Sequence, residues 1–314
     1  MKKELGTFIL LVVLCAVVAF LNPVFLSAVN LQNTAKLIGM FGIFSLGLGV
    51  VIITGGIDLS VGSMFALLGV LLSIFLTRRG WPPVPAVLAT ILIAMLLGAL
   101  HAFLITRINL QPFIVTLCGL LFYRGLARYI ANDETMGFSG ARGIEWLSYL
   151  ATGKPLGVPM PFVLLISISL VMWVVLHRSV YGRYLFAVGR NEMAARYSGI
   201  NSRRIVASAY VIMGLLAGVA GIIFAFDVNS ISPSSFGTSY ELYGIAAAVL
   251  GGCSLRGGEG SVVGILIGTA LLQVLQNLVN LLGIPSSLNF AVMGGVILFG
   301  VIADQFLQRR RALV

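Results

Sequence analysis

Four side-chain amides lie within an otherwise apolar stretch of the sequence, at Gln273, Gln276, Asn277 and Asn280. Their spacing of i, i+3, i+4 and i+7 places all four on one face of the stretch if it is helical. Neutral amides both donate and accept hydrogen bonds, so such a face suits contact with a hydroxyl-rich solute. The alternative is hydrogen bonding between helices, which averaged about 0.6 kcal/mol per pair in one membrane protein. Four amides on one stripe favour a polar pathway or a seam between subunits.

A single acid stands in the stretch TGGIDLSVGS, residues 54–63, between two strongly apolar runs. A carboxylate at bilayer depth costs about 2.5–3.5 kcal/mol on insertion scales, so Asp58 must face protein, water or a membrane surface. Gly55 and Gly56 weaken the helix here, and a broken helix is tolerated in a membrane where it lines a cavity or packs in protein. Asp58 and Ser60 are therefore pathway candidates. Asp58 could equally cap the following helix, and the two roles are compatible.

A second acid, Glu241, enters the apolar run of SYELYGIAAAVLGGCSLRGGEGSVVGILIG, residues 239–268, and is a further pathway candidate. The GGCSLR in this run echoes GGIDLS at 55–60, and an internal duplication is one explanation. No Gly-Lys-Ser/Thr follows the turn at 257–260, so this turn is not a phosphate-binding loop. Structural glycines are expected in the two breaks, at Gly55, Gly56, Gly251, Gly252, Gly257 and Gly258. Close helix contact is expected at two GxxxG pairs, Gly214 with Gly218 and Gly264 with Gly268.

Arginines recur in the stretch YGRYLFAVGRNEMAARYSGINSRR, residues 181–204. Within it, NEMAARYSG predicts a short helix that ends at Gly199. Membrane topology alone explains a basic loop, because cytoplasmic links are rich in Lys and Arg. It does not explain a compact, capped helix with two alanines at its centre, which would fit closely into a partner's groove. The residues expected to dock are Asn191, Glu192, Ala194, Ala195, Arg196 and Gly199.

The composition indicates which elements position these residues. Of the 314 residues, 59% are hydrophobic and only 10% are charged, whereas a soluble domain carries about 25% charged residues. The apolar residues gather in runs of about 17 to 22, long enough to cross a hydrocarbon core about 30 Å thick. A transmembrane barrel would instead show alternating segments of about ten residues. The chain is therefore predicted to be an all-α polytopic membrane protein, with the lipid bilayer as its surroundings.

About ten spans are predicted, and some are short or broken. The eighth is too short to cross upright, and the less apolar segment 23–36 is expected to lie along the interface. The predicted spans are near 5–22, 37–54, 57–77, 85–106, 111–130, 159–177, 205–226, 240–252, 261–282 and 288–306.

The basic residues predict how the chain is oriented. With the N-terminus inside, most Lys and Arg fall in cytoplasmic links, which places both termini in the cytoplasm. Arg78 and Arg79 fall on the other side. Because these charges lie in links between spans, the net charge of +10 does not indicate a nucleic-acid partner. No linker or soluble domain is visible, so residues 1–314 are predicted to form one transmembrane domain, with 181–204 as its main cytoplasmic loop.

Three of these stretches stand together in a known family. TGGIDLSVGS, YGRYLFAVGRNEMAARYSGI and YELYGIAAAVLGGCSLRGGEGSVVG resemble, in the same order, motifs of permease subunits of ribose/monosaccharide-type ABC importers. The resemblance implies a type II ABC importer-like fold in a bacterial inner membrane. It implies a permease dimer, identical or mixed, that moves a sugar delivered by a periplasmic binding protein. It also implies a separate cytoplasmic ABC ATPase that holds ATP and Mg²⁺, seats the loop around 191–199 and leaves this chain without a cofactor.

The sequence departs from the family pattern at Arg190, Met193 and Tyr243. These departures concern the particular ATPase and the particular sugar, and they leave the class intact. An ion-coupled secondary transporter is the main rival, but it needs charges near the midplane, and few are present besides Asp58 and Glu241. An intramembrane enzyme is a further rival. His101 and His177 stand alone in the sequence, without HExxH, GxSxG or a set of metal ligands, so the permease interpretation expects little effect from replacing either.

Overall fold

The computed structural model describes residues 2–285, 288, 291, 292, 294, 295 and 298, and within them the secondary structure is helical apart from one isolated bridge between Met136 and Ile231. In chain order the main helices are α1 (Lys2–Leu21), α2 (Ala28–Ile53), α3 (Val61–Ser73), α4 (Pro83–Thr106), α5 (Pro112–Ala131), α6 (Glu145–Thr152), α7 (Met160–Trp173), α8 (Val180–Arg190), α9 (Glu192–Tyr197), α10 (Ser202–Val228), α11 (Tyr240–Leu250) and α12 (Val262–Leu281). Short turns η1 (Pro23–Leu26) and η3 (Pro155–Gly157) lie between helices, and π-helical turns η2 (Ile74–Arg78) and η4 (Val174–Arg178) extend α3 and α7.

Eight helices in the described part of the chain are long and apolar enough to cross a membrane, which confirms the predicted fold class. They are α1, α2, α3 with η2, α4, α5, α7 with η4, α10 and α12, and they match the first seven predicted spans and the ninth. The predicted eighth span is α11, which has 11 residues and is too short to cross upright. The predicted tenth span, 288–306, falls mostly outside the described residues.

The segment 23–36 does not lie along the interface as the sequence predicted. A helical turn covers Pro23–Leu26, and α2 already begins at Ala28, where the Ser27 hydroxyl accepts a hydrogen bond from the Asn30 amide. The 26 residues of α2 extend about 39 Å at 1.5 Å per residue, more than the hydrocarbon core requires. The less apolar residues are therefore the first turns of a long helix that reaches beyond the core.

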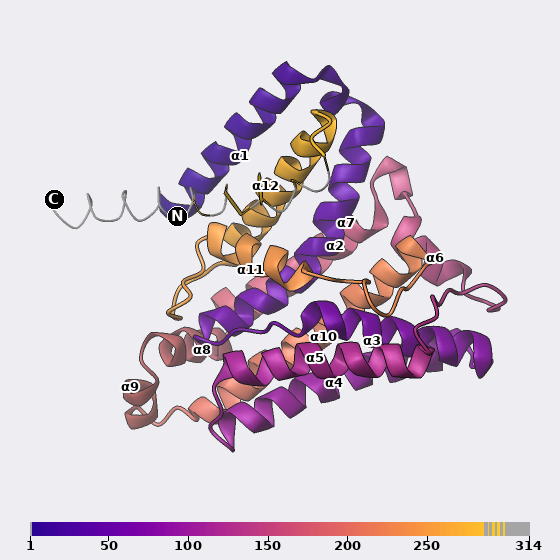
Figure 1. Cartoon of the computed structure of the whole chain (residues 1–314). Coiled ribbons are helices and arrows are strands. Elements are labelled where there is room, and N and C mark those ends of the chain that lie inside the picture. Colours follow the sequence, from indigo (N-terminus) through magenta and orange to yellow (C-terminus); the bar gives the residue numbers. More distant parts are fainter. Residues whose placement is uncertain (1, 286–287, 289–290, 293, 296–297, 299–314) are drawn as a thin grey trace.

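Helix α2 is the centre of the bundle, and glycines bring its neighbours close (Figure 1). A Cβ at Gly39 would lie 2.4 Å from the Pro161 backbone in α7, and one at Gly49 would lie 2.3 Å from the Ile265 side chain in α12. Small residues of this kind allow the close packing that associates helices in lipid. The two predicted GxxxG pairs act in the same way, against α4 and α11 respectively.

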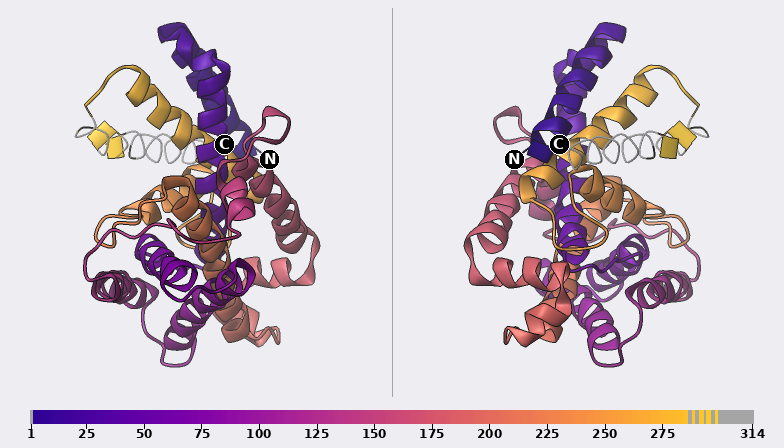
Figure 2. Two further views of the ribbon diagram at one scale, coloured as in Figure 1. Left: turned by 90° about the vertical axis from the view of Figure 1, so that its right-hand side faces the viewer. Right: turned by 90° about the vertical axis from the view of Figure 1, so that its left-hand side faces the viewer.

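The two ends of the bundle carry different features. At the left of Figure 1, α8 and α9 lie beside the end of α2 and the turn between α11 and α12. At the right lie α6 and the links 132–144 and 229–239, which the bridge between Met136 and Ile231 joins. The two panels of Figure 2 look at these ends in turn, with α3, α4 and α5 below α1 and α12.

Candidate functional site

The predicted short helix of the 181–204 loop is α9, and it is capped at both ends. The Asn191 side chain accepts a hydrogen bond from the Ala194 amide at 2.9 Å, which is the usual N-cap contact. Gly199 follows the helix with φ of +82°, a conformation that glycine adopts without strain, and its amide bonds to the Arg196 carbonyl at 3.0 Å. These caps fix the short helix as a compact unit at the edge of the molecule (Figure 1).

The two central alanines of α9 face opposite ways. Ala195 is 4% exposed and packs into the chain, whereas Ala194 is exposed. Met193 and Tyr197 lie on the outer side with 57% and 86% of their surface exposed. Both alanines were expected to dock, but Ala195 is covered by its own chain. Met193 and Tyr197 were not among the residues expected to dock, although exposed apolar side chains that lie together often mark a contact with another protein.

Glu192 and Arg196 hold α9 against the start of α10. The Arg196 guanidinium donates to the Glu192 carboxylate at 2.5 Å and to the Ser202 hydroxyl at 2.7 Å. The Ser202 hydroxyl in turn donates to Glu192 at 2.9 Å. Exposed ion pairs contribute only about 0–1 kcal/mol, so this cluster orients α9 more than it stabilises the fold.

A cavity of about 360 Å³ lies among α2, α10, α11 and α12, and it contains two of the predicted pathway residues. Gln273 and Gln276 line it from α12. Its volume falls in the range of about 300–1,000 Å³ typical of small-molecule sites. The remaining lining residues are Leu37, Met40, Phe41, Phe224, Asp227, Val228, Thr238, Tyr240 and Tyr243.

The four amides of α12 have different surroundings. Gln273 and Gln276 face the cavity. Asn277 instead exchanges two hydrogen bonds with Asn30 of α2, at 2.8 and 3.1 Å, and so joins two helices. Asn280 is exposed. The spacing correctly indicated one polar face, but the neighbours of each amide decide its contacts.

Replacement of Asn277 by leucine is expected to weaken the protein slightly and to leave transport intact. The change removes one interhelical amide pair, and such pairs contribute about 0.6 kcal/mol on average and at most about 1.7 kcal/mol in a membrane protein. Thermal unfolding of the detergent-purified protein measures this loss, and the double variant with Asn30→Leu should add little to it. Full stability together with a large loss of uptake would instead assign Asn277 to the pathway.

Asp58 lies in the break between α2 and α3, buried to 1% exposure. Its Oδ1 accepts hydrogen bonds from the Ser60 amide at 2.9 Å and the Ser60 hydroxyl at 2.7 Å. Ser60 is the N-cap residue of α3, so Asp58 fixes the turn just before the helix and not the helix amides themselves. The predicted capping role is thus present in a modified form. Neither residue lines the cavity described above.

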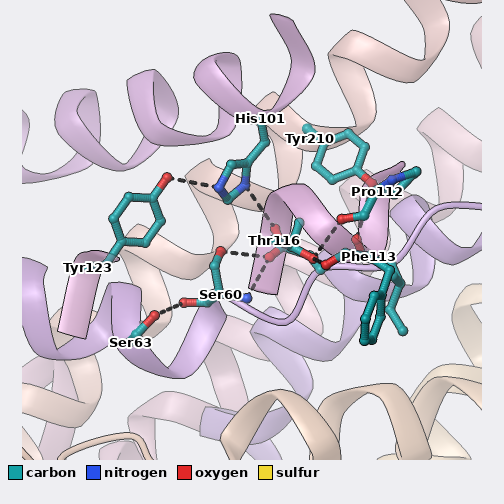
Figure 3. Close-up of polar contacts among 10 residues, drawn as sticks. Ser60, Ser63, His101, Pro112, Phe113, Thr116, Tyr123 and Tyr210 are labelled. Carbon is teal, nitrogen blue, oxygen red and sulfur yellow. Dashed lines mark hydrogen bonds and ion pairs between the residues drawn. The ribbon is translucent and has the colours of Figure 1, made fainter. Parts of the chain in front are cut away.

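Three ring side chains from different helices lie around this break: His101, Tyr123 and Tyr210 (Figure 3). His101 of α4 places Nδ1 3.8 Å from the Asp58 carboxylate and Nε2 2.8 Å from the Tyr123 hydroxyl of α5. The Tyr210 hydroxyl of α10 donates to the Ile57 carbonyl at 3.1 Å. His101 is therefore a buried member of a polar cluster, and its replacement is expected to disturb the fold, contrary to the expectation from the sequence.

Glu241, the second buried acid, lies in the first turn of α11. Its carboxylate contacts Gly62 in the first turn of α3, where a Cβ would be 2.4 Å from Oε2. Arg124 of α5 donates to the carbonyls of Pro233 and Phe236, at 3.0 and 2.8 Å, in the segment that leads into α11. Glu241 thus joins α11 to α3 and is not among the residues that line the cavity.

The structural glycines of the two breaks lie against each other. The Gly258 amide donates to the Ile53 carbonyl at 2.8 Å, and a Cβ at Gly257 would lie 2.9 Å from the Gly55 nitrogen. Gly189 at the end of α8 also approaches Ile53. A positive φ occurs at Gly55, Gly252, Gly257 and Gly258, whereas Gly56 and Gly251 pack against Tyr210 and Gly264. The ends of α2 and α8 therefore meet the turn between α11 and α12.

A helical bundle with many helices long enough to cross a membrane and a partly open cavity of small-molecule size suits a membrane transport protein. Residues 30–301 match the family described as branched-chain amino acid transport system / permease component, and the chain belongs to this family. It is therefore a transport permease and a multi-pass protein of the bacterial inner membrane.

Curated relatives are similar over nearly their whole length. The ribose import permease protein RbsC of Escherichia coli K12 is 38% identical over 301 residues, which cover 96% of this chain and 93% of the relative. RbsC of Bacillus subtilis 168 is 38% identical over 304 residues with the same coverage. The xylose transport system permease protein XylH of Escherichia coli K12 is 31% identical over an alignment of 368 positions that spans 98% of this chain and 93% of the relative.

Proposed function

We propose that this chain is the permease subunit of an ABC importer for a monosaccharide. The observation that carries the proposal is the similarity, over 93% of their length, to permeases named for ribose and xylose. The identity is higher to the ribose permeases than to the xylose permease, so a ribose-like pentose is the first substrate to test.

A cytoplasmic ABC ATPase is proposed to supply the energy through α9, and ATP and Mg²⁺ would bind to that partner. The exposed outer side of α9, formed by Met193, Ala194 and Tyr197, supports a docking contact. The arginines of 181–204 support a cytoplasmic location for this end of the bundle. The start of α1 lies at the same end, which supports a cytoplasmic N-terminus (Figure 1). The C-terminus is proposed to lie there as well.

The opposite end is proposed to receive a periplasmic sugar-binding protein. The residues expected to touch it are in 131–158 and 227–239, and the bridge between Met136 and Ile231 makes these two links one surface. Arg128 donates to the Asp133 carboxylate at 2.7 Å and holds the pKa of Asp133 below its usual value. Asp133 therefore stays negatively charged at a lower pH than an unpaired aspartate. A second permease subunit, identical or similar, completes the pathway.

Alternating access links the two ends. When the ATPase pair closes, α9 and α8 move together, because only Asn191 separates them. Gly189 at the end of α8 touches Ile53 at the end of α2, so the movement passes to the helix that forms one wall of the cavity. The cavity then opens to one side of the membrane at a time.

Uptake by the reconstituted complex tests this function. The permease is placed in vesicles with the ATPase and binding protein encoded by the neighbouring genes, and entry of labelled D-ribose, D-xylose and D-allose is measured. The proposal expects ATP-dependent entry of at least one sugar, and loss of that entry without the binding protein. Uptake driven by an ion gradient in the absence of the ATPase would instead make the chain a secondary transporter.

A further inference from the structure

The geometry points to the cavity among α2, α10, α11 and α12 as a sugar-contact site of the permease itself, in which the Gln273 amide binds a sugar hydroxyl. The class of solute rests on the function proposed above. The position of the site and its mode of contact rest on the burial, aromatic side chains and charges of the cavity.

The Gln273 side chain has a buried oxygen that accepts no hydrogen bond from the described part of the chain. The residue is 2% exposed, and its Oε1 has no hydrogen-bond partner in the part of the chain that the structure describes. A buried polar atom without a partner loses the hydrogen bonds that it makes to water and calls for an explanation. The last side-chain torsion of glutamine is broad and roughly two-fold, so either end of the amide can turn toward the cavity that Gln273 lines. A hydroxyl group, which donates and accepts, satisfies either end.

The walls of the cavity suit the apolar side of a sugar. The Phe41 ring lies at the centre of an aromatic cluster, with centroids 5.0 Å from Tyr240, 5.9 Å from Tyr243 and 5.2 Å from Phe224. Ring faces carry partial negative charge and attract the polarised C–H groups of a sugar ring. Apolar and aromatic side chains line most of the cavity beside a few polar groups, a combination typical of small-molecule sites.

The charges at the cavity are already paired. Asp227 lines the cavity, and Lys36 Nζ donates to its carboxylate at 2.8 Å. The side chains are 15% and 27% exposed, so the pair is partly shielded from water. The carboxylate can accept a further hydrogen bond from a sugar hydroxyl. Because Lys36 is already paired and the lining residues include no other cation, the cavity offers no counter-charge to a phosphorylated sugar.

The cavity lies toward the end of the bundle proposed to meet the binding protein. Asp227 and Val228 stand at the end of α10, and Thr238 stands in the link that follows. A sugar released there reaches the cavity before it passes the breaks at the opposite ends of α2 and α11. Conduction requires a site weak enough to release its ligand, so the contact is expected to be transient.

Protection of a cysteine tests the site without reliance on transport. In a chain whose three native cysteines are replaced, Gln276→Cys in the assembled complex is labelled by a small thiol reagent. Millimolar D-ribose is expected to slow this labelling, and D-ribose 5-phosphate is not. Gln111→Cys, at an exposed position in the link between α4 and α5, is the control and should label at the same rate with either compound. If D-ribose, D-xylose and D-allose all leave the labelling rate of Gln276→Cys unchanged, the proposal is wrong.

Replacement of Gln273 by leucine gives a second readout. Sugar uptake is expected to fall about two- to tenfold, the range for the loss of one hydrogen bond. ATP hydrolysis stimulated by the binding protein should persist, since α9 is unchanged, and Gln111→Leu should leave both rates as they were. If the wild-type complex imports sugar and Gln273→Leu imports it equally fast, Gln273 is not a sugar contact, and the proposed function stands. Failure of the wild-type complex to import any test sugar would contradict the proposed function instead.

Discussion

Replacement of Ala194 by tryptophan is expected to abolish ATP-driven uptake and to leave the permease folded in the membrane. Ala194 is the small residue of the exposed side of α9, between Met193 and Tyr197. A bulky side chain there prevents close approach of the ATPase but meets solvent in the free chain. A central interface residue contributes about 2 kcal/mol or more, which corresponds to about thirtyfold weaker association. Retention of the ATPase on washed membranes and uptake of sugar measure the two effects.

Two further variants separate docking from folding at this helix. Ala194→Ser keeps the residue small and should bind the ATPase and transport normally. Ala195→Trp places the same bulk on the inner side of α9, where Ala195 is 4% exposed, and should reduce the amount of folded protein. If Ala194→Trp transports as well as Ala194→Ser does, α9 does not dock in the way proposed.

Replacement of Asp58 by alanine is expected to destabilise the bundle strongly. It leaves the Ser60 amide and hydroxyl without the acceptor that they share. Each buried polar group that loses its partner costs about 1–3 kcal/mol, so two such groups cost about 2–6 kcal/mol, a large part of the 5–15 kcal/mol or so that stabilises a typical domain. The yield of monodisperse protein in detergent and its unfolding temperature measure the loss.

Asp58→Asn is the matched control, because it keeps an acceptor oxygen of nearly the same shape. It should retain most of the stability, and so should Tyr123→Phe, which removes only the hydroxyl partner of His101. If Asp58→Ala is as stable as Asp58→Asn but transports poorly, the carboxylate acts in the pathway and not in the break.

The sequence was sufficient to predict the elements whose signal is local. The lengths of the apolar runs predicted the eight described spans and the short α11, because the thickness of the bilayer sets those lengths. Asn191 and Gly199 predicted α9, because caps depend on residues only a few positions apart. The start of α2 was missed, because hydropathy does not report the Ser27 cap that extends the helix past its apolar part.

Contacts between distant segments could not be predicted in the same way. Periodicity placed four amides on one face of α12, but only the packing of α2 shows that Asn277 meets Asn30 while Gln273 meets a cavity. His101 appeared isolated because its partner Tyr123 is 22 positions away on another helix. The sequence likewise gives no means to tell which of two adjacent alanines in α9 faces outward.

Cross-linking from position 197 in the purified complex shows whether the energy for transport enters this chain through α9. A cysteine in place of Tyr197, whose side chain is 86% exposed, is combined with a short bifunctional thiol reagent. We expect a cross-link to a nucleotide-hydrolysing subunit, and slower labelling of this cysteine in the complex than in the free permease. Equally fast labelling in both, in a preparation that transports sugar without any such subunit, would show that α9 is not the entry point for energy.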